Sequence, residues 1–275
     1  MDLLLFTSLF SLFTSLNYIF NQNIKYDNHI LIPLTGIQLY LNIFTINIGL
    51  RGFNNLCYRI IKNNQKLIES VRSFLYYLFT SILLHNSLNH NEWFLKKNLF
   101  NNIETHGFRY IEYIIYYIQI SYYLNEIIDR YIYSNNLIKR KDDKEMLLHH
   151  IITLTLLLGS YYTNLIRAGL YVLYLHDIND IFLQLSKTLV YLEYKDNITD
   201  ITFGIFIISW IYTRLYLYTS LTLEMGNNYY GKSTLYNILF YSMSCLALLN
   251  FCWFKMILNV IYNKLVKNKL EDVRE

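Results

Sequence analysis

Long apolar blocks separated by short polar stretches make up most of this chain. An apolar helix of about 20 residues crosses a hydrocarbon core about 30 Å thick. Because an isolated strand cannot satisfy its backbone polar groups in lipid, the blocks are expected to be helices. The pattern therefore predicts an all-α polytopic membrane protein with about seven or eight transmembrane helices, near residues 1–20, 32–50, 67–85, 108–126, 146–164, 168–190, 201–223 and 236–262.

Composition supports a membrane protein and excludes several other classes. Of the 275 residues, 54% are apolar and 16% are charged, which is too little charge to cover a soluble domain of this length. Cys57, Cys245 and Cys252 show no paired spacing, so neither a disulfide framework nor a zinc knuckle is indicated. The first block has Asp2 as its only charge and no small-residue cleavage pattern, so we expect an uncleaved span rather than a signal peptide.

The basic residues between the blocks predict the orientation of the chain. Segments that follow even-numbered blocks contain fourteen of them: Arg51, Arg59, Lys62, Lys66, Arg130, Lys139, Arg140, Lys141, Lys144, Lys195, Lys264, Lys267, Lys269 and Arg274. Segments that follow odd-numbered blocks contain five: Lys25, Lys96, Lys97, Arg167 and Lys232. Cytoplasmic segments carry the excess of basic residues, so both termini are expected in the cytoplasm. The small net charge of +4, placed in this way, suits membrane orientation better than nucleic-acid binding.

The blocks at 146–164 and 168–190 each carry a polar face. The turn between them is very short, so the two helices are expected to be antiparallel neighbours. On a helix with about 100° per residue, one polar stripe within about 60° contains His149, Thr153, Ser160, Asn164 and Arg167. A second arc of about 100° contains His176, Asp177, Asp180, Gln184, Lys187 and Tyr191. Faces of this kind are expected to line a cavity and not to contact lipid.

The energetic cost of these charges favours a functional interpretation. A charged side chain near the bilayer centre costs about 2.5–3.5 kcal/mol even on the lenient insertion scale, so Asp177, Asp180 and Lys187 together would cost roughly 8 kcal/mol if unpaired. An ion-pair network that only holds helices together is the simpler interpretation. Three histidines and two carboxylates directed toward one cavity make a reactive site the better prediction.

Weaker polar features lie in three other blocks. Glu69 and Arg72, three residues apart, are expected to form an intrahelical ion pair. In the block at 108–126, an arc of about 40° is expected to face the same cavity and contains Glu112, Gln119 and Glu126. Arg214 is expected to pair with the carboxylates of that arc.

The polar residues resemble the Lag1 motif of ceramide synthases, a group within the larger TLC-domain family. That motif is a double histidine followed, after about two dozen residues, by H-D-x-x-D-x-x-L-E-x-x-K. Here the double histidine is His149-His150, and HDINDIFLQLSK runs from His176 to Lys187. One departure lies inside the motif, because Gln184 stands where the family usually has Glu.

The resemblance extends over about residues 55–262, and its most specific part is the motif at 147–191. It divides the chain into N-terminal spans at 1–54, a TLC domain at 55–262 and a basic cytoplasmic tail at 263–275. The tryptophan that the family usually has near Arg72 is absent.

The resemblance implies both a fold and a reaction. The fold would be a TLC-type bundle around a central cavity. The protein would be a sphingosine or sphinganine N-acyltransferase, which transfers a fatty acyl group from acyl-CoA to a sphingoid base and forms ceramide or dihydroceramide. Acyl-CoA is then a co-substrate, and neither a further cofactor nor a metal is expected. Expected partners are long-chain acyl-CoA, a sphingoid base and membrane lipids but no nucleic acid, with homo- or heterodimers left open, in the endoplasmic reticulum membrane.

The resemblance and the polar faces together nominate ten site residues. Catalytic roles are expected for His149, His150, His176, Asp177 and Asp180, and substrate binding for Asn164, Arg167, Gln184, Lys187 and Arg214. Imidazole is reactive near neutral pH, and His149 heads the polar stripe, whereas His150 lies about 100° round the helix. We therefore expect His149 to form an acyl-imidazole and Asp177 or Asp180 to help deprotonate the amine. Direct attack by the amine, with His149 as general base, is the alternative.

Three other functions use the same residues. A metal-dependent lipid hydrolase would bind zinc through His149, His150, His176 and Asp180. A proton-coupled transporter would use them as a relay, but the chain has no inverted repeat and no pair of Gly/Pro-broken helices. A non-catalytic TLC-domain protein that senses lipid would not require the double histidine and the second block, and this chain keeps both.

Overall fold

A computed structural model describes residues 46, 48–53, 55–59, 61, 64–89, 99, 110–128, 140–194 and 197–267. No strand occurs among these residues. Short helical segments at 48–53 and 55–59 precede the longer helices, which are α3 (Gln65–Asn89), α4 (Tyr110–Ile127), α5 (Asp143–Tyr162), α6 (Ile166–Tyr191), α7 (Asn197–Trp210), the π-helix η3 (Ile211–Leu217), α8 (Tyr218–Tyr229) and α9 (Thr234–Lys267).

These helices match the six apolar blocks that follow residue 65. Five blocks correspond to one helix each, and the block at 201–223 corresponds to α7, η3 and α8 in sequence. The described residues contain three helices long and apolar enough to cross a membrane, judged by length and composition: Gln65–Leu88, Asn197–Tyr229 and Thr234–Val266. The chain is thus an all-α polytopic membrane protein. The predicted block at 1–20 and most of the block at 32–50 lie outside the described residues.

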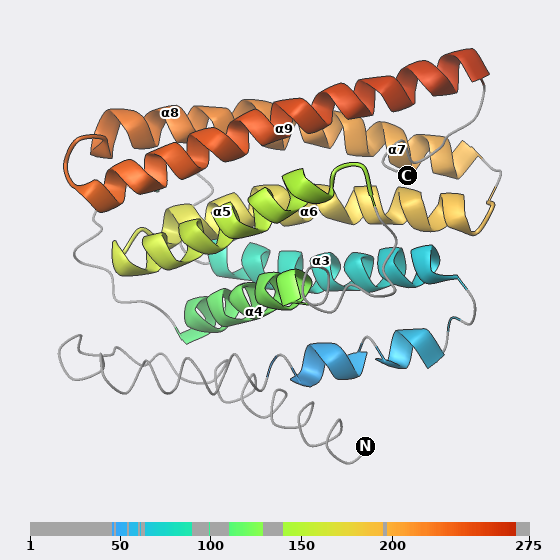
Figure 1. Ribbon diagram of the computed structural model, residues 1–275, viewed down its shortest axis with the longest axis horizontal. Coiled ribbons are helices and arrows are strands. Elements are labelled where there is room, and N and C mark those ends of the chain that lie inside the picture. The colour runs from blue at the N-terminus through green and yellow to red at the C-terminus, as the bar shows by residue number, and fades with distance from the viewer. Residues whose placement is uncertain are drawn as a thin grey trace.

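The helices form a bundle with α6 at its centre. In Figure 1, α8 and α9 lie along the top, α5 and α6 across the middle, and α3 and α4 below them. Helix α6 packs most extensively against α3 and then against α7, while α5 packs against α9 and α4. Because α6 is in contact with helices on several sides, its polar face is directed into the protein and not toward lipid.

The turn between α5 and α6 brings the two motif helices together in opposite directions. Asn164 has φ 58°, in the left-handed region that asparagine tolerates better than most residues. The amide of Thr163 donates to the Gly159 carbonyl at 3.0 Å, which closes the last turn of α5. The two helices contact each other, so the predicted antiparallel pair is confirmed (Figure 1).

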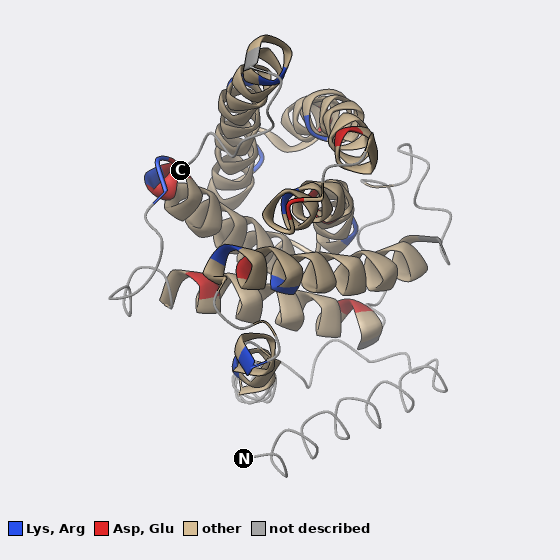
Figure 2. Ribbon diagram, turned by 90° about the vertical axis from the view of Figure 1, so that its right-hand side faces the viewer, with Lys and Arg blue, Asp and Glu red and all other residues tan. Residues whose placement is uncertain are grey.

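The start of α5 determines the level at which the double histidine lies. Asp143 and Glu145 occupy the first turn, where carboxylates interact favourably with the helix dipole. The Asp143 carboxylate also accepts a hydrogen bond from the Arg140 amide at 3.0 Å. The double histidine consequently falls in the second turn of the helix. Helix α5 begins near the middle of the view in Figure 1, whereas α3 and α7 begin and α6 and α9 end at its right-hand side. Figure 2 views the molecule from that side, and acidic and basic residues lie on several of the helices that meet there.

Candidate functional site

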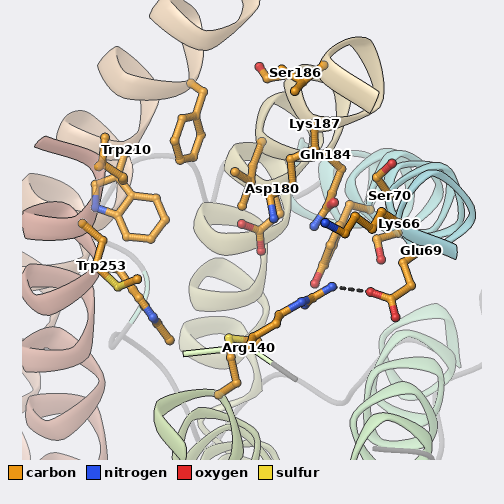
Figure 3. Close-up of a pocket in the computed structure, with 18 of the residues that line it drawn as sticks. Lys66, Glu69, Ser70, Arg140, Asp180, Gln184, Ser186, Lys187, Trp210 and Trp253 are labelled. Atoms are coloured by element: carbon orange, nitrogen blue, oxygen red, sulfur yellow. Dashed lines mark hydrogen bonds and ion pairs between the residues drawn. The ribbon is translucent and has the colours of Figure 1, made fainter. Parts of the chain in front are cut away.

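A cavity lies among α3, α4, α5, α6, α7, η3 and α9, and we call it the charged cavity. Its volume is about 190 Å³. Its lining includes two histidines, two tryptophans and eight charged side chains: His149, His150, Trp210, Trp253, Lys66, Glu69, Arg72, Glu126, Arg140, Asp180, Lys187 and Arg214. Helix α6 contributes Asp180, Gln184 and Lys187 from one face, as the helical spacing predicted (Figure 3).

Ion pairs between helices organise the charges at the α3 side of this cavity. Arg72 on α3 pairs with Glu126 on α4 at 2.7 Å. Glu69 on α3 pairs with Arg140, which precedes α5 (Figure 3). Glu69 and Arg72 interact electrostatically, in line with the predicted pair, and each side chain also pairs with a charge on another segment. Spacing along one helix does not reveal which charges the neighbouring helices present.

Arg214 is held in the π-helix η3 and connects three parts of the site. Its guanidinium donates to the Asp180 carboxylate at 2.6 Å and to the His176 carbonyl at 3.2 Å. It also lies over the Trp210 ring, 4.4 Å from the centroid. The expected pairing of Arg214 with α4 carboxylates is wrong, since its partner comes from α6. A π-helical turn within an α-helix is a frequent feature of functional sites, and here it carries the arginine.

The double histidine lies at the inner wall of the charged cavity. His149 and His150 are both buried, and their ring centroids are 5.6 Å apart. The His149 ring also meets Trp253 edge-on at 5.4 Å and is 6.5 Å from the His176 ring. His150 lines the cavity as well, so its position about 100° round the helix does not remove it from the site. His149 and Asp180 both line this cavity. The sequence alone did not predict whether these two residues lie at the same depth in the membrane.

A second, apolar cavity adjoins His149 on the side away from the charges. Its volume is about 50 Å³. We call it the apolar cavity, and its lining is Tyr123, His149, Thr153, Leu156, Leu157, Ser160, Leu165, Ala168, Gly169, Val172, Leu173, His176, Met225, Leu239, Met243 and Leu246. Of all these residues only His149 also lines the charged cavity. His149 therefore stands at the boundary between a charged space and an apolar one.

His176 faces the apolar cavity with one defined tautomer. Its Nδ1 lies 2.8 Å from the Val172 carbonyl oxygen, which can only accept, so Nδ1 carries the proton. In the neutral ring Nε2 is then an acceptor, and it has no hydrogen-bond partner among the described residues. The ring packs edge-on against Tyr218 at 5.0 Å. His176 thus presents a lone pair close to His149.

Asp177 has a different environment from Asp180. It is fully buried, and its Oδ2 accepts hydrogen bonds from Thr80 at 2.7 Å and from Gln119 at 2.6 Å. Gln119 in turn accepts a hydrogen bond from Tyr76 at 3.0 Å. Asp177 therefore joins α6 to α3 and α4, and it lines neither the charged cavity nor the apolar cavity.

Comparison with known proteins identifies the family. The family model for the TLC domain matches residues 66–259, well over half of the chain. The chain belongs to the TLC-domain family. Within it, the chain is 29% identical over 235 residues to sphingosine N-acyltransferase lag1 of Schizosaccharomyces pombe, covering 78% of this chain and 58% of that protein.

Two other relatives carry related names. Ceramide synthase 4 of Bos taurus is 31% identical over 251 residues, covering 85% of this chain and 62% of that protein. Ceramide synthase LAG1 of Saccharomyces cerevisiae is 34% identical over 149 residues, covering 49% of this chain and 36% of that protein. The chain thus spans about three fifths of the length of the first two of these three relatives.

Two of the substrate-binding predictions fall at the far end of the TLC domain. Asn164 is exposed in the α5–α6 turn, and Arg167 near the start of α6 interacts electrostatically with the buried Glu112. Neither lines either cavity, whereas Gln184 and Lys187 line the charged cavity. Asn164 and Arg167 share the helical stripe of His149 but lie three or more turns away from it. A helical wheel shows the angle of each residue around the helix axis but not its position along that axis. It therefore groups residues that lie far apart in the bundle.

Several lining residues were not nominated from the sequence. Lys66, Tyr122 and Trp253 line the charged cavity from α3, α4 and α9, outside the motif. A tryptophan within an apolar block has no feature that separates it from an ordinary core residue. Lys66 directly precedes the predicted span at 67–85, and a basic residue at such a position predicts membrane orientation and does not by itself indicate a site.

The histidines do not form a metal site in this arrangement. Among the described residues, no group of three or more His, Cys, Asp or Glu side chains is placed to hold a metal ion. The Asp180 carboxylate is engaged with Arg214, and the His149 and His176 rings are 6.5 Å apart. The geometry gives no support to the zinc-dependent hydrolase.

Proposed function

We propose that this protein is a sphingosine or sphinganine N-acyltransferase, which moves a fatty acyl group from acyl-CoA to a sphingoid base. The observation that carries the proposal is the position of His149 at the boundary of the charged and apolar cavities. Acyl-CoA likewise has a charged part and an apolar part, since a thioester joins a phosphate-bearing head to an apolar chain. The printed names of the relatives support the same substrates.

The two halves of acyl-CoA fit the two cavities. The phosphates are attracted to the basic residues of the charged cavity, which include Lys66, Arg140 and Lys187. The acyl chain enters the apolar cavity, where burial of each methylene group contributes about 0.8 kcal/mol. This placement leaves the thioester beside the His149 ring.

Acyl transfer then proceeds in two steps through His149. An imidazole nitrogen attacks the thioester carbonyl, a carbon–nitrogen bond forms, and the carbon–sulfur bond breaks as the CoA thiol leaves with the imidazole proton. The amine of the sphingoid base next attacks the same carbonyl, and the amide forms as the bond to His149 breaks. The amine proton passes to Nε2 of His176 and from there to the released imidazole of His149. Asp180 attracts the ammonium form of the incoming base within the charged cavity, and the ammonium releases one proton to water before the free amine attacks.

The proposed orientation places the charged cavity at the cytoplasmic side of the endoplasmic reticulum membrane. Coenzyme A is too polar to enter lipid, so its head must reach the site from water. The described helix ends beside this cavity include Lys66, Arg140 and Lys264, which are among the basic residues that predict a cytoplasmic side. We assign the catalytic unit to residues 55–262, with 1–54 and 263–275 outside it.

The proposal is tested with membranes from cells that express the full chain and lack their own ceramide synthases. Sphinganine and a panel of acyl-CoAs are supplied, and dihydroceramide is measured by mass spectrometry. We expect product with wild type and none with His149→Ala present at the same level. No product from folded wild type would overturn the proposal. Release of fatty acid from supplied ceramide, blocked by a chelator, would replace it with the zinc-dependent hydrolase.

A further inference from the structure

We propose that Trp253 on α9 and Tyr123 on α4 are positioning residues that hold the His149 ring in its reactive orientation. Both rings contact the imidazole, and neither residue belongs to the motif. We call the two rings the aromatic clamp. We rest this role on the proposed function, in which the His149 ring reacts with the acyl group. The clamp extends that function to two helices that do not carry the motif.

The His149 ring is not oriented in the way that the His176 ring is. The His176 ring is fixed by the hydrogen bond that its Nδ1 donates to the Val172 carbonyl. Among the described residues, Nδ1 of His149 is buried and has no hydrogen-bond partner. The χ2 torsion of histidine is broad, so the covalent geometry of the side chain does not define the ring angle. Packing against neighbouring rings is therefore what directs the His149 nitrogens.

The aromatic clamp contacts this ring from two sides of α5. The ring centroids of Trp253 and His149 are 5.4 Å apart with an interplanar angle of 77°, and those of Tyr123 and His149 are 6.0 Å apart at 72°. Both separations lie in the range of about 4.5–7 Å that edge-to-face aromatic pairs favour. In Figure 1, α9 lies above α5 and α4 lies below it, and α5 packs against both. Rotation of the imidazole would weaken both contacts.

The two rings of the clamp are themselves held in place. Trp253 and Tyr123 are both buried. Trp253 packs edge-on against Trp210 with ring centroids 6.5 Å apart, and the Arg214 guanidinium lies over Trp210 at 4.4 Å. Tyr123 packs edge-on against Tyr122 with centroids 5.7 Å apart. Rings with so little freedom of their own can define the angle of the imidazole between them.

The rate of acylation tests the role of Trp253. Purified wild type, Trp253→Leu and Trp253→Phe are mixed with palmitoyl-CoA alone, and the acyl adduct is followed over time by intact-protein mass spectrometry. We expect Trp253→Leu to slow adduct formation about 100-fold, since a misplacement of about 1 Å can cost that much. Trp253→Phe keeps an aromatic ring and should recover most of the rate. The exposed Phe251 on the same helix provides a matched control, because Phe251→Leu should not change the rate.

The final amount of adduct separates positioning from folding. Loss of folded protein would lower the adduct per molecule at completion, while the molecules that remain folded would react at the wild-type rate. Loss of ring orientation should instead lower the rate constant and leave the final amount at the wild-type value. A wild-type rate constant in folded Trp253→Leu would overturn the role of Trp253.

Tyr123 provides a second test if Trp253→Leu does not fold. Tyr123→Leu removes the other ring of the clamp and should slow adduct formation about tenfold. Tyr123→Phe keeps the ring without the hydroxyl and should retain most of the rate. Equal loss in the two variants would mean that the hydroxyl acts and not the ring, which would overturn the clamp.

Steady-state kinetics distinguish failure of the clamp from failure of the proposed function. If wild type forms dihydroceramide without an adduct, kcat takes the place of the acylation rate in the same comparisons. The clamp variants should then lower kcat and keep KM for palmitoyl-CoA and sphinganine within about threefold of wild type. An unchanged kcat in the folded variants would overturn the clamp while ceramide synthesis stands. Absence of product from folded wild type would instead overturn the proposed function itself.

Discussion

The residues of the motif lie in different environments, and we expect some of them to act on the substrate and others to support the fold. Of the three motif histidines, His149 alone lines both cavities, whereas His150 borders the charged one and His176 the apolar one. Of the two aspartates, Asp180 borders the charged cavity and Asp177 is enclosed by Thr80 and Gln119. Residues adjacent in sequence therefore have separate environments, and substitutions should separate their roles.

Incubation with acyl-CoA alone should leave an acyl group on His149. Intact-protein mass spectrometry should detect one acyl adduct on wild type, and sphinganine should discharge it. The adduct should be absent from His149→Ala, because the attacking nitrogen is missing. An adduct that survives His149→Ala but not His150→Ala would show that the neighbouring histidine reacts. Turnover without any adduct would favour direct attack, with His149 as general base.

Replacement of each aspartate by asparagine should give opposite results. Asp177→Asn keeps an oxygen to accept from Thr80 and Gln119, so activity should remain within a few-fold of wild type. Asp180→Asn removes the negative charge that attracts the substrate ammonium and should lower kcat/KM about 100-fold. Asp177→Asn should retain its folded yield, measured by size-exclusion chromatography in detergent. Asp180→Asn leaves Arg214 without its carboxylate and should lower the folded yield, so the two activities are compared per amount of folded protein. Equal loss of activity in the two would contradict this division of roles.

At the level of elements, the π-helix η3 joins the motif helix to the C-terminal half of the bundle. It interrupts a run of α-helix between α7 and α8, and its Arg214 binds Asp180 on α6 and approaches Asn250 on α9 at 3.5 Å. The Arg214 side chain is 4% exposed, so its charge is almost fully removed from water and depends on the pair. Removal of one partner leaves a buried charge uncompensated, which is strongly destabilising.

Asp180→Leu leaves the buried Arg214 charge without its carboxylate and should therefore lower the free energy of unfolding by about 3–5 kcal/mol. Thermal unfolding of the purified protein in detergent measures the effect. The double variant Arg214→Met with Asp180→Leu removes both charges and should recover most of the stability without recovering activity. A single variant as stable as wild type would mean that the pair contributes nothing to holding η3 against α6.

At the scale of the whole molecule, the charged cavity and the basic helix ends share one side of the bundle. The cavity is lined by the first half of α3, the start of α5 and the second halves of α6 and α9. Helix α3 begins and helices α6 and α9 end at the same side of the bundle, on the right in Figure 1. The basic residues Lys66, Arg140 and Lys264 come from the same helix ends or just before them. In the proposed function, substrate access and membrane orientation are coupled, because the side that retains basic residues would also present the site to coenzyme A.

The sequon at Asn197-Ile198-Thr199 tests this orientation. Asn197 begins α7 at the same side and is exposed, yet it should carry no glycan if that side faces the cytoplasm, as we propose. Endoglycosidase treatment should leave the electrophoretic mobility of the protein unchanged. A protease added to sealed microsomes should remove a C-terminal tag. A glycan on Asn197, or a protected tag, would reverse the topology.

The sequence by itself determined the features that depend on helical periodicity and on the free-energy cost of leaving backbone polar groups unsatisfied in lipid. Apolar blocks near 20 residues long predicted six of the described helical regions, because only helices of that length satisfy the backbone in lipid. The spacing of Asp180, Gln184 and Lys187 likewise predicted a shared inward face, since one helix defines their relative angles.

The tertiary structure alone decided which groups meet across helices. It paired Arg214 with Asp180 and Arg72 with Glu126, enclosed Asp177 between Thr80 and Gln119, and moved Asn164 and Arg167 to the far end from the charged cavity. It also placed Tyr116 against Gly169, which a single helical pattern cannot foresee. The reason is physical: periodicity defines angle around one axis, whereas contact between helices depends on their relative depth, rotation and spacing, which packing of the whole bundle determines.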